Sequence, residues 1–338
     1  KDVGARFLAN CYSVLNDKEK KSLLLVATSG DTGSAVANAF LGIKNVEAVI
    51  LYPHNKVSPM QEKQFASLGE NITALAVEGT FDDCQKLVKQ AFLDEELKKT
   101  FQLSSANSIN IARWLPQSVY YFYAYAQLKK QLEREAKPLV ISVPTGNLGN
   151  LTAGLLAKKM GLPVSYFIAA TNNNNTIPEF LRSGAYTPKS SVQTISNAMD
   201  VGDPSNYSRM LYLYNSAYDS ICKDVKGFYF DDEATKTALI DVNKNVQYLM
   251  DPHGTVGYMA LKKIISEKEI GLFLETAHPA KFSEVVEPLI KKPVALPESL
   301  KKFENRVVNS QRVSNDYEQF KKKLISDYQA AAKKDLIG

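Results

Sequence analysis

Short hydrophobic runs rich in β-branched residues alternate along this chain with longer amphipathic segments. The short runs predict strands at 23–27, 46–52, 72–77, 101–104, 139–143, 164–170 and 271–275. The longer segments have hydrophobic residues at helical spacing and predict helices near 33–41, 58–68, 81–99, 111–134, 151–160, 176–183, 231–246, 255–267 and 280–290. Such alternation is typical of an α/β fold, in which parallel sheets carry helices on both faces. We therefore expect functional loops at the C-terminal ends of the strands.

The length of the chain adds an expectation about its organisation. At 338 residues it exceeds what one hydrophobic core usually fills, so we expect two lobes. A hydrophobic content of 45% with 23% charged residues is that of an ordinary globular protein. A last amphipathic segment, at about 315–334, predicts an outer helix with Asn315 as its cap.

The charge pattern argues against a nucleic-acid or membrane partner. The net charge of +5 comes from 41 basic and 36 acidic residues, and the dense lysine runs lie near the C-terminus, where solvated helix faces explain them. No apolar run approaches the roughly 20 residues of a membrane helix, and no signal peptide is visible. The three cysteines have no CxxC spacing, which predicts a reducing compartment without disulfides or a zinc site. The three histidines are far apart in sequence, so we predict no metal site and expect a cap or core role for each. We expect a cytoplasmic protein.

The first residue, Lys1, stands in a helix-like pattern with no methionine before it, which predicts that an N-terminal segment precedes it in the intact protein. One strand later comes the loop Thr-Ser-Gly-Asp-Thr-Gly, residues 28–33. A lysine that enters a helix and a hydroxyl-rich loop after a strand suit an enzyme that holds an aldehyde cofactor covalently beside an anionic substrate.

A glycine-rich loop, Pro-Thr-Gly-Asn-Leu-Gly-Asn at 144–150, follows the strand at 139–143 and precedes a predicted helix. Glycines allow main-chain N–H groups to converge on an anion, and the helix N-terminus adds partial positive charge, so the loop suits a phosphate. A plain strand-to-helix turn is the alternative reading. The loop matches neither the GxGxxG fingerprint nor the nucleotide-triphosphate motif.

Other polar clusters also follow predicted strands. The hydroxyls and amides of 28–33 suit a carboxylate and part of a phosphate, although Ser29 or Thr32 alone would serve as a helix cap. The segment Ser-Ser-Ala-Asn-Ser-Ile-Asn at 104–110 precedes Arg113, which has the geometry for an anion but in isolation would more often form a surface ion pair. Thr276 stands at the end of the last predicted strand.

Together these segments carry a family resemblance. In order along the chain occur Lys1-Asp2, TSGDTG at 28–33, LYP at 51–53 with SPMQEK at 58–63, SANSINIAR at 105–113, PTGNLGN at 144–150, SNAMDV at 196–201 and TAHPAKF at 276–282. From residue 1 to about 290 the chain resembles the threonine synthase family, in the longer form of bacteria and fungi whose N-terminal domain precedes the lysine.

The resemblance implies a two-lobed pyridoxal-phosphate enzyme of fold type II, similar to the β chain of tryptophan synthase. Such an enzyme converts O-phospho-L-homoserine and water to L-threonine and phosphate. By the resemblance, residues 1–20 and 136–300 would form the larger, cofactor-binding lobe, 21–135 the smaller, substrate-binding lobe, and 301–338 a helical extension.

The same resemblance assigns residue roles. Lys1 would form the Schiff base and then move protons. The cofactor phosphate would be held by the main-chain amides of Gly146, Asn147, Leu148, Gly149 and Asn150. Thr276 would bind the pyridine nitrogen, and Asp31 would face the cofactor side of its loop. The substrate would be bound by Thr28, Ser29, Thr32, Asn107, Ser108 and Arg113.

Two alternatives of different class remain open at this point. A related phospholyase or dehydratase would release a 2-oxo acid, whereas a non-catalytic relative would only hold pyridoxal phosphate. The sequence leaves the oligomeric state open between a monomer and a homodimer.

Overall fold

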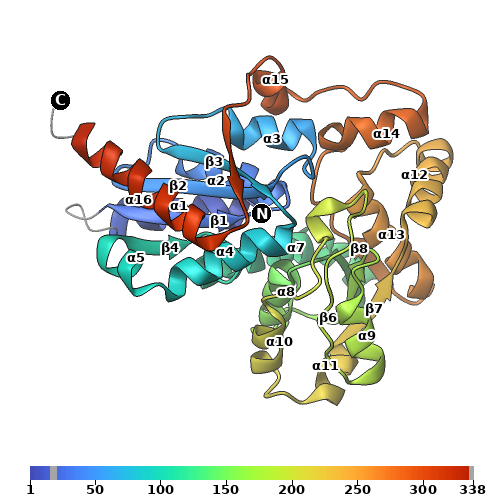
Figure 1. The fold of residues 1–338 in the computed structure, drawn as a ribbon. Helices are drawn as coiled ribbons and strands as arrows, with labels where there is room; N and C mark the ends of the chain where they lie inside the picture. The colour runs from blue at the N-terminus through green and yellow to red at the C-terminus, as the bar shows by residue number, and fades with distance from the viewer. Residues whose placement is uncertain (16–20, 335–338) are drawn as a thin grey trace. The chain divides into compact units, whose positions relative to one another are not determined.

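The computed structural model describes residues 1–15 and 21–334, which divide into two units (Figure 1). The first unit contains Lys1, Val3 and Ser108–Lys302, and the second contains Asp2, Gly4–Asn107 and the chain from Phe303 onward. The boundary thus falls at 107/108, whereas the sequence predicted 135/136. Residues 4–15 and 303–334 also belong to the second unit, in contrast to the predicted division.

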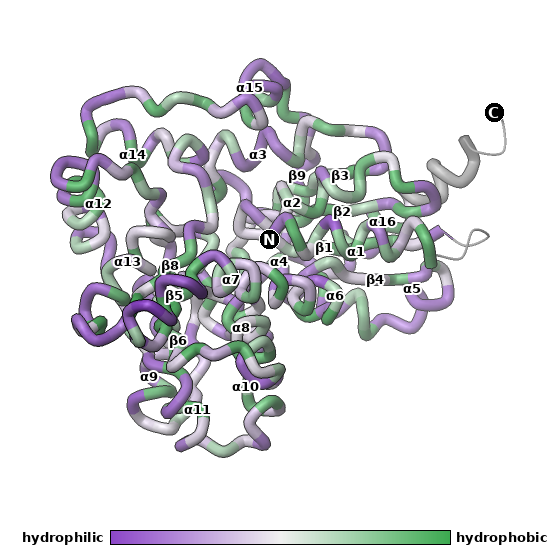
Figure 2. The backbone as a smooth tube through the Cα atoms, turned by 180° about the vertical axis from the view of Figure 1, so that it is seen from behind, coloured by the Kyte–Doolittle hydropathy of each residue, from purple (hydrophilic) through white to green (hydrophobic). Residues whose placement is uncertain are grey.

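The second unit is built on a parallel sheet of strand order β4-β1-β2-β3-β9. Its strands are β1 (Ser22–Ala27), β2 (Val46–Pro53), β3 (Ile72–Glu78), β4 (Gln102–Ser105) and β9 (Ser310–Ser314). Every residue of β1 is buried, and Figure 2 shows hydrophobic residues concentrated along the central strands. The helices of this unit include α1 (Asp2–Leu15), α2 (Asp31–Phe40), α3 (Pro59–Ala66), α4 (Phe81–Leu93), α5 (Glu95–Thr100) and α16 (Tyr317–Lys334).

The first unit is built on a parallel sheet of order β7-β6-β5-β8. Its strands are β5 (Leu139–Pro144), β6 (Val164–Thr171), β7 (Val225–Tyr229) and β8 (Ile270–Phe273). The helices are α6 (Ile111–Trp114), η1 (Leu115–Gln117), α7 (Ser118–Glu135), α8 (Gly149–Lys159), α9 (Thr176–Ser183), η2 (Asn197–Met199), α10 (Tyr207–Leu213), α11 (Tyr218–Asp224), α12 (Asp232–Val246), α13 (Pro252–Ile264), η3 (Pro279–Phe282) and α14 (Ser283–Ile290). Helix α15 (Glu298–Glu304) includes the boundary at Lys302/Phe303.

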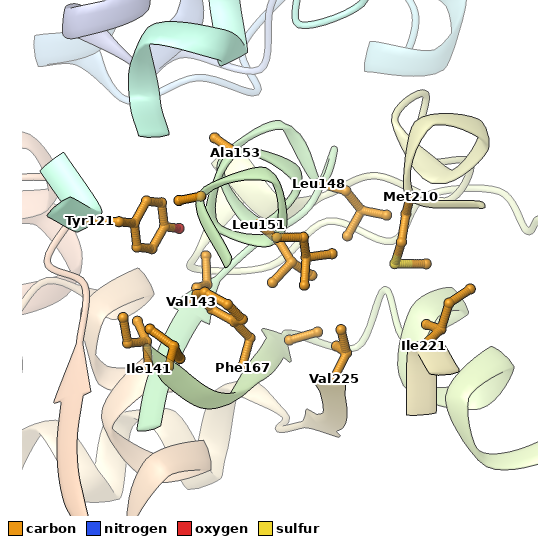
Figure 3. Packing of buried hydrophobic residues seen from close by; sticks show 14 of the residues in the cluster. Tyr121, Ile141, Val143, Leu148, Leu151, Ala153, Phe167, Met210, Ile221 and Val225 are labelled. Atoms are coloured by element: carbon orange, nitrogen blue, oxygen red, sulfur yellow. The ribbon is translucent and has the colours of Figure 1, made fainter. Parts of the chain in front are cut away.

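The sheet of the first unit packs against helices on both faces. Successive residues of a strand point to opposite sides of the sheet, so neighbouring residues of β5 lie in different clusters. Ile141 and Val143 of β5 lie in a cluster with Leu148 and Leu151, at and beyond the start of α8 (Figure 3). Val140, the residue before Ile141 in β5, lies in a different cluster with Val256 and other residues of α13. Helices therefore cover the sheet on both sides, which confirms the predicted parallel α/β fold.

Two strands and several helix boundaries differ from the sequence prediction. Strand β9 is polar and β7 is mostly half-buried, so neither has the hydrophobic run that identifies a strand. The helix predicted at 81–99 is interrupted at Asp94, whose side chain caps α5. The cap predicted at Asn315 is wrong, because Asp316 accepts the N–H of Gln319 at the start of α16. Among the residues described, no helix is long and apolar enough to cross a membrane.

Candidate active site

The glycine-rich loop after β5 turns directly into α8. Leu148 adopts the left-handed conformation, with φ of 60°, and its fully buried side chain packs in the core under the helix (Figure 3). No side chain caps α8. The first N–H groups of a helix have no acceptor within the helix and carry its partial positive charge, so this N-terminus offers several donors to an anion.

Gly146 and Gly149 lie where other segments of the chain come close to the loop. A Cβ at Gly146 would lie 2.7 Å from Cα of Met199, and a Cβ at Gly149 would lie 3.0 Å from Cβ of Ser108. We call residues 145–150 the phosphate cup. Its uncapped main-chain amides at the N-terminus of α8 fit a phosphate group.

The amide side chains of the cup serve to hold its shape. Asn147 donates from Nδ2 to Ser108 Oγ (3.1 Å) and accepts the N–H of Ser205 (2.6 Å). Asn150 accepts both tyrosine hydroxyls of α7, from Tyr120 and Tyr121, each at 2.5 Å. The side chains of Asn147 and Asn150 are therefore occupied by structural contacts, and the binding of an anion by their main-chain amides stays a prediction.

A neighbouring cluster was not singled out from the sequence. Asn206, fully buried, donates to both Ser108 Oγ (2.9 Å) and the carbonyl of Asn147 (2.8 Å). Arg209 donates to the carbonyl of Ile109 and to Asn206 Oδ1. The hydroxyl of Ser108 thus accepts two amide donors, which joins Ser108 to the cup within the first unit. The sequence signal was the polar pair Ser205-Asn206 before α10.

Lys1 and Arg113 lie in contact within the first unit. Arg113 Nη1 donates to the main-chain carbonyl of Lys1 at 2.8 Å, and the Arg113 side chain is only 2% exposed. The alternative of a surface ion pair for Arg113 is therefore wrong. Lys1 itself is exposed, so the guanidinium fixes its main chain while the residue stays accessible.

Thr276 lies beyond the end of β8, is exposed, and directly follows Glu275, whose carboxyl group has a raised pKa. The carboxyl of Glu275 lies against Gly254, where a Cβ would meet its oxygens at 2.3 and 2.5 Å. Burial of this group and the nearby charge of Asp251 raise the pKa of Glu275 to about 9. His278, two residues beyond Thr276, caps η3 by accepting the N–H of Ala280, as expected for a cap role.

In the second unit, the 28–33 loop is organised by its first threonine. Thr28 Oγ1 accepts the N–H groups of Gly30 (3.0 Å) and Gly33 (2.7 Å), and its side chain is fully buried. Gly30 is the N-cap of α2 and has no side chain, so Thr28 is the residue that accepts the N–H of Gly33 in the first turn. The alternative that Ser29 or Thr32 caps this helix is therefore wrong, and both residues remain half-buried.

Two further predicted site residues of this unit make structural contacts. Asn107 donates from Nδ2 to the carbonyl of Ala27 (2.6 Å) and accepts the N–H of the same residue (3.0 Å). This paired bond fixes the end of β1, just before the loop. Asp31 is 7% exposed and accepts from Gln61 Nε2 at 3.2 Å.

Comparison with known proteins defines the class. A family model described as pyridoxal-phosphate dependent enzyme matches residues 1–273. With its two parallel sheets, the chain has the fold of a pyridoxal-phosphate enzyme of fold type II.

More specific similarities follow. A model described as the C-terminal part of threonine synthase matches residues 255–324. A threonine synthase of Buchnera aphidicola from Acyrthosiphon pisum is 49% identical over 91% of this chain and 70% of its own length. The crystal structure of threonine synthase from Escherichia coli superposes with a TM-score of 0.90 at 46% identity, over 96% of this chain and 74% of that one. The pyridoxal-phosphate-bound threonine synthase from Brucella melitensis gives 0.85 at 34% identity, over 96% and 74%. The chain belongs to the threonine synthase family.

Proposed function

We propose that this chain catalyses the threonine synthase reaction, which converts O-phospho-L-homoserine and water to L-threonine and phosphate. The observation that carries the proposal is the uncapped, glycine-lined N-terminus of α8 in the same unit as an accessible Lys1. Family membership supplies the substrate and the product. Pyridoxal phosphate, when bound, supplies the electron sink for elimination and addition at the substrate carbons.

The residues of the first unit hold the cofactor in this proposal. The main-chain amides of Gly146 to Asn150 bind its phosphate. Lys1 holds its aldehyde carbon and afterwards moves protons with Nζ as general acid and base. Arg113 supports this role through its bond to the Lys1 carbonyl, because an anchored main chain limits the positions that the flexible side chain samples.

Thr276 binds the pyridine nitrogen through its hydroxyl. The raised pKa of the adjacent Glu275 favours the neutral form of its carboxyl, which places no negative charge beside that nitrogen. A hydroxyl, unlike a carboxylate, does not hold the nitrogen protonated. The proposal therefore favours elimination chemistry over transamination.

For the substrate, we propose direct contacts from the half-buried hydroxyl residues Ser29 and Thr32. The buried Thr28 and the paired bond of Asn107 support the loop that carries them. Ser108 and Arg113 complete the predicted substrate set, and Asp31 the predicted cofactor set. We further propose a cytoplasmic enzyme, monomeric or homodimeric, that has no nucleic-acid partner.

Product analysis tests this function. The protein is incubated with pyridoxal phosphate and O-phospho-L-homoserine, and threonine, phosphate and 2-oxobutyrate are measured together. Threonine and phosphate should form in equal amounts. Formation of 2-oxobutyrate with ammonia would identify a phospholyase instead, and the absence of turnover with a bound cofactor would identify a binding protein.

A further inference from the structure

The floor of the phosphate cup is formed by a loop from a distant part of the sequence. A Cβ at Gly146 would meet Met199 Cα at 2.7 Å and Val201 Cγ2 at 3.1 Å. We call residues 194–201 the floor loop. Because Met199 approaches the cup backbone this closely, the position of the floor loop sets the position of Gly146.

The floor loop is held by side chains that accept its main-chain N–H groups. Thr194 N–H donates to Asp200 within the loop, at 3.0 Å. Ile195 N–H donates to Asp232 at the start of α12, at 3.3 Å. Ala198 N–H, one residue before Met199, donates to Nε2 of His253 at 3.1 Å. The His253 contact therefore holds the residue directly before Met199, whose main chain comes closest to Gly146.

The tautomer of the His253 ring follows from the hydrogen-bond partners of its two nitrogens. Its Nδ1 lies 2.6 Å from Oδ1 of Asp251, and the two side chains are 2% and 0% exposed. Because Nε2 accepts a hydrogen bond from an amide, it carries no proton. The ring is then neutral, and the proton on Nδ1 is donated to Asp251. The ring also packs against Phe282, with centroids 4.9 Å apart.

We propose that His253 is a positioning residue for the cofactor phosphate: its Nε2 anchors Ala198 and thereby holds Met199 against the cup at Gly146. Asp251 fixes the tautomer that makes Nε2 an acceptor. This inference rests on the proposed function, since it takes the cup as the cofactor phosphate site. His253 does not touch the reacting atoms and acts through the floor loop.

A matched pair of substitutions separates positioning from general packing. The amide of His253→Gln reaches the place of Nε2 and can accept from Ala198, whereas the shorter His253→Asn reaches only the place of Nδ1. Both variants remove the imidazole from the same buried site, so both should lower the melting temperature. The dissociation constant of pyridoxal phosphate should rise about 10- to 100-fold in the Asn variant, which leaves a buried N–H unpaired, and by less than about 3-fold in the Gln variant.

The cofactor constant is measured by fluorescence titration of the apoprotein, without turnover. Equal constants in the two variants, or weaker binding by the Gln variant, would overturn the inference while leaving the proposed function intact. Failure of the wild type to bind pyridoxal phosphate would overturn both. A second measurement applies even if neither variant folds. The chain has three histidines, so imidazole ¹⁵N shifts of histidine-labelled wild type report the tautomer. The His253 proton should be on Nδ1, and a proton on Nε2 would refute the inference.

Discussion

Replacing Gly146 with alanine should weaken cofactor binding through steric displacement of the cup. The new Cβ would lie 2.7 Å from Met199 Cα, where ordinary contacts begin at 3.4 Å, so main chain on one side must move by about 0.7 Å. Inserting a methyl group into such a contact costs about 1–3 kcal/mol. If the cup is the part that moves, the dissociation constant of pyridoxal phosphate rises roughly 5- to 150-fold. Fluorescence titration of the apoprotein measures this constant.

The chain offers a matched control in Gly227→Ala. There the new Cβ would lie 2.8 Å from the main-chain Cα of Pro178, but the contact joins β7 to α9 and involves neither the cup nor the floor loop. Both variants should lose stability to a similar degree, while only Gly146→Ala loses cofactor affinity. Equal cofactor constants in the two variants, at equal losses of melting temperature, would refute the steric role of the cup.

Two further predictions concern buried charged side chains. Arg113→Ala removes a charge-assisted bond to the Lys1 carbonyl, so the free energy of unfolding in urea should fall by about 1.5–3 kcal/mol; an unchanged value would show that this contact is not formed in solution. Burial raises the pKa of Asp200 from an ordinary 3.8 to about 6, so the folded protein binds this proton more tightly than the unfolded chain does, and the associated stability is present below about pH 4 and lost as the pH rises through about 6. Relative to Asp200→Asn, the wild type should therefore lose about 2 kcal/mol of unfolding free energy between pH 4 and pH 7, and parallel pH profiles of the two proteins would contradict this.

The hydrophobic pattern predicted most of the sheet strands because parallel strands are buried on both faces. Every residue of β1 and β5 is buried, so these strands appear as continuous apolar runs. Strand β9 has the sequence SQRVS, and its place is set by pairing with β3 across more than two hundred residues of chain. Such pairing leaves no local signal.

At the site, too, features with a local sequence signal could be predicted and long-range contacts could not. The loop at 145–150 was predictable as a strand-to-helix connection because its glycines mark a tight turn, while its binding of a phosphate stays a prediction. The contacts of Asn206 and His253 were not predictable, because each depends on a partner far away in the sequence. The sequence predicted substrate contacts for Thr28 and Asn107. It did not predict that the side chains of both residues form hydrogen bonds that shape the loop near β1. Their direct contact with a substrate stays a prediction.

The central claim is that Lys1 holds the cofactor. Reduction of the pyridoxal-phosphate-loaded protein with borohydride, followed by peptide mapping, tests it most directly. The phosphopyridoxyl label should be on the side-chain nitrogen of Lys1, and Lys1→Ala should take up no label at that peptide while turnover falls by at least about 100- to 10,000-fold, the usual contribution of general acid and base catalysis. A label on any other lysine, or near-normal turnover of the alanine variant, would contradict the assignment of Lys1 and the mechanism built on it.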